Sequence, residues 1–208
     1  MTLARAREIV TLAVRSGCFD KSELADLIED HADDEGDIAT LRGLVVKLSD
    51  TQRAAEAKWD ALTTNDRLTR AFAELRRRGI VAIENAGYNA PSTSDDAWDA
   101  IYDEATNFDD PPRGAVFYCG ADLAGAVAGK GLALTCGALE EVAVDRGTTI
   151  RRRERAPLDE LAREICDALA RHEIAARWTG EHIAIAPFRW QRRAFTKAPK
   201  LGPKRRPR

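Results

Sequence analysis

Apolar residues recur at helical spacing along the first sixty positions of the chain. Asp20 and Glu23 stand three residues apart, as in an N-terminal capping box, and an apolar stripe at i, i+3 and i+4 follows them. A longer amphipathic pattern predicts a helix over residues 38–59. Strand-like alternation is absent from this part of the sequence. We therefore expect residues 1–60 to form an N-terminal helical segment.

From residue 61 onward, helical patterns alternate with short β-prone runs. The runs that predict strands are residues 80–83, 115–119 and 132–136. Two more short apolar runs flank Thr179-Gly180, which predicts a hairpin and hence an antiparallel pair. Residues 138–156 have no clear pattern. The order predicts an α/β or α+β domain over residues 61–190, with a mixed sheet of four to six strands.

Two of the predicted helices have apolar stripes that should face the sheet. The helix that starts at Ser94 is expected to turn Trp98 and Tyr102 inward. Pro157 suits the first turn of a helix, in which Leu158 is expected to begin the buried stripe.

The charges are distributed unevenly along the chain. Residues 187–208 hold nine Lys or Arg and no Asp or Glu, which leaves 23 basic and 34 acidic residues elsewhere, a net charge of −11. Proline and glycine recur among the last residues. We therefore predict a disordered basic tail over residues 191–208, on an acidic body.

Membrane and secretory signals are weak in this sequence. No apolar stretch approaches the roughly 20 residues that span a bilayer. The run from Ile9 to Val14 is shorter than a secretory apolar core of about 7–15 residues. The four cysteines are far apart and do not suggest a disulfide framework. We expect a soluble, cytoplasmic protein without membrane contact.

Three segments resemble a known family. They are Gly79-Ile-Val-Ala-Ile-Glu-Asn-Ala-Gly-Tyr88, Arg113-Gly-Ala-Val-Phe-Tyr118 and Pro187-Phe-Arg-Trp-Gln-Arg-Arg193. The chain is similar over roughly residues 62–193 to an uncharacterised family of bacterial, mainly actinobacterial, proteins of unknown function. The resemblance implies kinship and no mechanism. Some relatives have a cysteine-rich segment that would suit a zinc site. At the same place this chain has residues 89–94, which contain no cysteine, so the resemblance implies no metal here.

Metal and cofactor binding have little support from the residue pattern. The three histidines are isolated and no cysteine pair has zinc-ligand spacing, so we expect no metal and no cofactor. Asp95, Asp99 and Asp103 fall at i, i+4 and i+8 on one helix face. This face is interpreted as solvated, as docked against the protein's own arginines or tail, or as a Mg²⁺ or Ca²⁺ site.

Catalytic motifs are not evident, since the sequence has neither a nucleophile elbow nor a phosphate-binding loop. We expect a non-catalytic binding or regulatory module for a protein or small-molecule partner, with an enzyme that uses carboxylates or tyrosines as one alternative. Its surface is predicted at the loop 85–94 and nearby aromatics, converging at one sheet edge. The candidate residues are Asn85, Tyr88, Asp95, Trp98, Tyr118 and Trp190.

Nucleic-acid association is a second alternative, because a tail rich in cations can contact phosphates. The candidate contacts are Arg192, Arg193, Lys204, Arg205 and Arg206. No base-reading motif accompanies them. A solubilising or self-docking tail explains the same composition.

Overall fold

The computed structural model describes residues 1–86, 94–108, 110–139, 144–146, 149–151 and 157–194, without the side chains of 94–96, 144–146 and 149–151. The chain divides into two compact units, which are described separately. The helical unit comprises residues 1–66 together with the chain from residue 191. The α/β unit comprises residues 67–190.

Three helices build the helical unit: α1 (Leu3–Ser16), α2 (Lys21–His31) and α3 (Glu35–Glu56). The predicted capping box is confirmed, since Asp20 accepts the Glu23 backbone N–H at 2.9 Å and the Glu23 carboxylate accepts that of Asp20 at 2.7 Å. α1 packs against both other helices. No helix among the described residues has the length and apolarity needed to cross a bilayer.

The α/β unit alternates helices and short strands. Their bounds are α4 (Thr64–Arg77), β1 (Ile80–Ile83), α5 (Ser94–Ala105), β2 (Gly114–Phe117), α6 (Gly120–Val127), β3 (Leu132–Ala138), β4 (Val144–Arg146), β5 (Thr149–Arg151), α7 (Leu158–Arg171), β6 (Ala176–Trp178) and β7 (Ile183–Ile185). The first three residues of α4 still belong to the helical unit.

The main sheet is mixed and five-stranded, with the order β1-β2-β3-β7-β6. β1 and β2 are parallel, with Ile83 opposite Phe117, and the other neighbours are antiparallel. The predicted fold class is confirmed, as is the hairpin of β6 and β7. In the segment without a clear pattern, β4 and β5 form a separate antiparallel pair.

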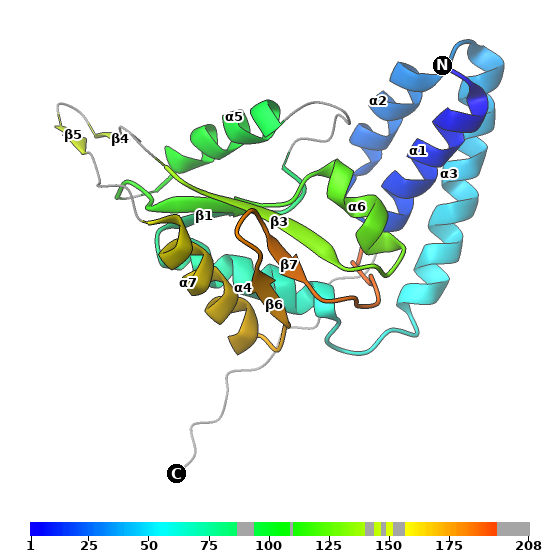
Figure 1. Ribbon diagram of the computed structural model, residues 1–208. Coiled ribbons are helices and arrows are strands. Elements are labelled where there is room, and N and C mark those ends of the chain that lie inside the picture. The colour runs from blue at the N-terminus through cyan, green and yellow to red at the C-terminus, as the bar shows by residue number, and fades with distance from the viewer. Residues whose placement is uncertain (87–93, 109, 140–143, 147–148, 152–156, 195–208) are drawn as a thin grey trace. The chain divides into compact units, whose positions relative to one another are not determined.

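Helices cover both faces of this sheet, with α5 on one side and α4 and α7 on the other (Figure 1). Successive β2 residues face opposite ways. Phe117 belongs to the core cluster beneath α5, whereas a Cβ on Gly114 would lie 2.5 Å from the Leu161 side chain of α7. Glycine at this position therefore lets α7 lie close to the sheet.

Two stripe residues were predicted wrongly. Leu158 is 37% exposed and Tyr102 is 45% exposed. Leu161 and Ile165 form the buried stripe of α7, and Leu158 lies in the first turn, before that stripe. Ile101 of α5 is fully buried. Tyr102 is the next residue along the helix and therefore points away from the buried face.

Candidate functional site

The carboxyl ends of the parallel strands β1 and β2 bring together polar side chains that are distant in sequence. Glu84 and Asn85 follow β1 directly, and Tyr118 and Cys119 follow β2. The backbone N–H of Ala86 donates to the Tyr118 carbonyl oxygen at 2.8 Å and extends the pairing past the strand ends. Open α/β sheets commonly bind ligands at such an edge.

Tyr118 is fully buried, although its hydroxyl lies in this polar group. The hydroxyl donates to a carboxylate oxygen of Glu84 at 3.5 Å, a long hydrogen bond. Its ring lies 6.2 Å from the Trp190 ring in an edge-to-face arrangement and 6.3 Å from the Phe72 ring of α4. Aromatic packing therefore fixes the tyrosine in place, with its hydroxyl at the edge of hydrogen-bond distance from the Glu84 carboxylate.

Asn85 has an unusual backbone and an unusual side chain. Its φ of +56° is left-handed, a conformation that asparagine tolerates better than most residues. The side-chain oxygen Oδ1 is buried and has no hydrogen-bond partner among the described residues. An acceptor in that state costs roughly 1–3 kcal/mol relative to a paired one. A ligand that donates a hydrogen bond there would recover this free energy.

Cys119 and Asp122 are hydrogen-bonded to each other at the start of α6. The Asp122 carboxylate accepts the Cys119 backbone N–H at 3.0 Å and lies 3.3 Å from its Sγ atom. Burial raises the pKa of the Cys119 thiol, and the negative charge of Asp122 raises it further. The thiol is therefore protonated at neutral pH and is a poor nucleophile.

The predicted aromatic surface separates onto two sheet faces. Trp98 packs edge-to-face on Phe117 at 5.3 Å, beneath α5, whereas Tyr118 contacts Phe72 of α4 on the other side. The structure thus brings Tyr118 and Trp190 together and does not bring Trp98 to them. Consecutive residues of an extended chain point to opposite faces, which accounts for the separation. Tyr88 lies outside the described residues.

The acidic face of α5 is open to solvent where its side chains are described. Asp99 and Asp103 are exposed, and the side chain of Asp95 lies outside the description. Glu104, in the same acidic helix, forms an ion pair with Arg76 of α4, so this residue docks on one of the protein's own arginines. Within the described ranges, no three His, Cys, Asp or Glu side chains lie together as metal ligands would.

The start of the predicted basic tail belongs to the helical unit. Residues 191–194, here called the C-terminal anchor, are held by the segment that precedes and begins α4. The Gln191 N–H donates to Asn65 Oδ1 at 2.7 Å, and the Ala194 N–H donates to a Glu56 carboxylate oxygen at 2.8 Å. Both acceptor residues are 2% exposed. The anchor is therefore tied to buried acceptors of the helical unit, whereas residues 195–208 lie outside the described part of the chain.

The structure gives Arg193, one of the two arginines of the anchor, partners within the protein. Arg193 and Asp66 form an ion pair, with the Nε atom 3.4 Å from Oδ2 and both side chains 9% exposed. The Arg193 guanidinium also lies 5.8 Å from the Trp59 ring. Arg193 is thus engaged within the protein, and its predicted contact with nucleic acid stays a prediction. Arg192 is half-buried, and Lys204, Arg205 and Arg206 lie outside the description.

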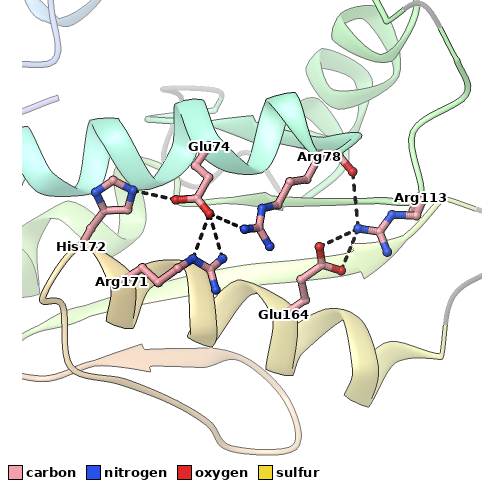
Figure 2. A network of polar contacts seen from close by, with 6 residues as sticks. All are labelled: Glu74, Arg78, Arg113, Glu164, Arg171 and His172. Carbon is pink, nitrogen blue, oxygen red and sulfur yellow. Dashed lines mark hydrogen bonds and ion pairs between the residues drawn. The ribbon is translucent and has the colours of Figure 1, made fainter. Parts of the chain in front are cut away.

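A network of charged side chains, which the sequence analysis did not predict, links α7 to α4 (Figure 2). The carboxylate oxygens of Glu74 in α4 lie 2.7 Å from Arg78 Nη2, 2.9 Å from Arg171 Nη2 and 2.9 Å from His172 Nε2. Burial alone would raise the pKa of Glu74, but the hydrogen bonds from Arg171 and His172 and the charges of Arg171 and Arg78 lower it on balance. Only the i, i+4 pair with Arg78 carries a sequence signal.

The same network continues toward the sheet. The Arg113 Nη2 atom donates to both carboxylate oxygens of Glu164 at 2.7 Å and to the Arg78 carbonyl oxygen at 3.4 Å. Every charge in Figure 2 has a partner drawn beside it. The α4–α7 charge network is therefore interpreted as a structural fastening, and the strand edge with Glu84 and Asn85 is the better candidate site.

Comparison with known proteins identifies a family of unknown function. Residues 2–194 match the family described as a domain of unknown function, DUF6891. The match includes the N-terminal helices and the C-terminal anchor, so it extends beyond the motif-bearing residues 62–193. No curated protein and no solved structure matches the chain. The chain belongs to the DUF6891 family.

Proposed function

We propose that the protein is a non-catalytic binding module that takes a small ligand at the carboxyl edge of β1 and β2. The observation that carries this proposal is the Asn85 Oδ1 atom, a buried acceptor without a partner among the described residues. Asn85 follows Glu84 in the sequence, and the Glu84 carboxylate lies 3.5 Å from the Tyr118 hydroxyl. A regulatory role would follow if ligand binding changed this edge.

The acceptors at this edge indicate the chemistry of the ligand. Asn85 Oδ1 and the Glu84 carboxylate both accept hydrogen bonds, and Glu84 adds negative charge. The Asp122 carboxylate already accepts the Cys119 N–H at the start of α6, so this helix start offers an anion less than an uncapped one would. The site therefore favours a ligand with N–H donors, such as a small amine or amide.

Binding agrees with these side chains better than turnover does. The raised pKa of Cys119 keeps its thiol protonated, and Tyr118 is enclosed by aromatic rings. Neither residue offers an accessible nucleophile. Turnover of an amine or amide substrate, abolished by Glu84→Gln, would favour the enzyme alternative over this proposal.

The test uses small amines and amides, with matched carboxylic acids as negative probes. Binding is followed in ¹H–¹⁵N spectra of the full chain through the amide signals of residues 84–86 and 118. Asn85→Gly removes Oδ1 while keeping a residue that accepts positive φ. We expect affinity to fall about tenfold, the effect of one lost hydrogen bond of about 1.4 kcal/mol.

Glu173→Gly is the matched control, because Glu173 has a φ of +60° and lies elsewhere in the same unit. It makes the same backbone change and should leave ligand affinity unaltered. Equal loss in both variants, or amines and amides that shift no signal at residues 84–86, would contradict the proposal.

A further inference from the structure

The helical unit carries an apolar groove of about 630 Å³ that the proposed ligand site does not use. Its floor comes from Leu24 and Ile28 of α2 and from Val45 and Val46 of α3. Val46 is 62% exposed. Apolar grooves between helices commonly accept a segment with apolar side chains.

The C-terminal anchor ends at this groove. Ala194 lines it, and the Ala194 N–H is fixed by the buried carboxylate of Glu56. The next residue in the sequence is Phe195, and Leu201 follows six positions later. The chain therefore enters the groove region at a fixed point, with an aromatic residue immediately beyond it.

The length of this segment matches the groove, and its charge is opposite to that of the helical unit. Fourteen residues follow Ala194, which reach about 45 Å when extended, whereas the eleven residues of α2 span only about 16 Å. Residues 195–208 contain six Lys or Arg and no acid. Residues 1–66 contain 14 Asp or Glu against eight Lys or Arg, a net charge of −6. Asp20 and Asp50 line the groove, as do Lys21, Arg42 and Arg53, so the opposite charge belongs to the helical unit as a whole and not to the groove lining.

We propose that residues 195–208 dock in the groove between α2 and α3 of the same molecule, with Phe195 on its apolar floor and the cations against the acidic helical unit. Docking in the same chain is favoured because the anchor holds the segment at the groove, which raises its effective concentration to the order of 1 mM.

The first test is zero-length carbodiimide cross-linking of the full chain. We expect cross-links from Lys197 or Lys200 to Asp20 or Asp50 in the monomer band, identified by mass spectrometry. Cross-links confined to a dimer band would overturn the proposal and assign the groove to contact between copies. Absence of these cross-links in every band would also overturn it.

The second test compares two full-chain variants that add the same charge at adjacent positions. Phe195→Asp removes the apolar group, and Thr196→Asp is the matched control. For a dissociation constant on the order of 100 μM, Phe195→Asp should speed amide exchange of residues 24–28 and 45–49 about tenfold. Thr196→Asp should exchange as the wild type does. Equal exchange in the wild type and both variants would overturn the proposal.

Discussion

Replacing Arg193 with alanine tests whether the C-terminal anchor is structural. Arg193 pairs with Asp66 at 3.4 Å, stacks near Trp59 at 5.8 Å and donates to the Asp60 carbonyl oxygen. Its removal leaves the Asp66 carboxylate buried without its cation. The helical unit should therefore lose stability, whereas an arginine that served only to contact phosphates would be dispensable for folding.

The expected loss follows from the partners that remain. Breaking one side of a buried ion pair costs about 3–5 kcal/mol. Asp66 keeps hydrogen bonds from the Thr63 backbone N–H at 2.8 Å and from the Thr63 hydroxyl at 3.0 Å, which places the loss at the lower end. We expect Arg193→Ala to lower the free energy of unfolding by about 3 kcal/mol, including about 0.5–1 kcal/mol from Trp59. Arg193→Lys keeps the charge but loses the planar fork, so about half of that loss is expected.

Urea unfolding followed by circular dichroism measures the loss, and hydrogen exchange of α3 assigns it to the helical unit. Arg189→Ala is the matched control because Arg189 is exposed, and surface substitutions usually change stability by less than about 0.5 kcal/mol. The reasoning is refuted if Arg193→Ala and Arg189→Ala are equally stable. Weaker retention on polynucleotides without loss of stability would instead support the nucleic-acid hypothesis for Arg193.

Two further predictions concern the α/β unit. The pKa of Glu74 is lowered from 4.5, so its ion pairs stabilise the fold above that pH and are lost as pH falls through the lower, folded-state value. Glu74→Gln should therefore cost about 1 kcal/mol at pH 7 and reduce the loss of stability between pH 7 and pH 3, measured by urea unfolding. An unchanged dependence of stability on pH would contradict this. A Cβ at Gly137 would lie 2.5 Å from the Trp98 ring, so Gly137→Ala should cost about 1–3 kcal/mol by overpacking. Thermal unfolding measures this loss, with Gly43→Ala as comparison, because Gly43 is exposed and a Cβ there meets nothing within 4 Å.

Local signals in the sequence were sufficient for most elements of the fold. The capping box at Asp20 and Glu23, the strand at residues 80–83 and the hairpin around Thr179 each depend on neighbours within a few positions. Periodicity also predicted the mixed sheet. Periodicity failed at Leu158 and Tyr102. Each of these residues lies beside the buried stripe of its helix, and other residues occupy the buried positions. Burial there depends on what packs across from the helix, which periodicity does not contain.

The polar contacts could not be predicted in the same way, because their partners are far apart in sequence. Arg193 and Asp66 are 127 positions apart, and Glu74 and His172 are 98 apart. In the sequence each of these residues resembles a solvated charge, and Arg193 belongs to a run of cations. The candidate site also depends on residues far apart in sequence, because the register of β1 with β2 brings Glu84 close to Tyr118.

The position of the anchor changes where the folded chain should be considered to end. A boundary at residue 190 would remove the N–H donors that satisfy Asn65 and Glu56, two side chains that are 2% exposed. Buried acceptors that lose their donors each cost roughly 1–3 kcal/mol, and Arg193 would be lost with them. The family match that ends at residue 194 includes all of these contacts. The cationic segment is therefore residues 195–208, and it follows directly from a fixed point on the acidic helical unit.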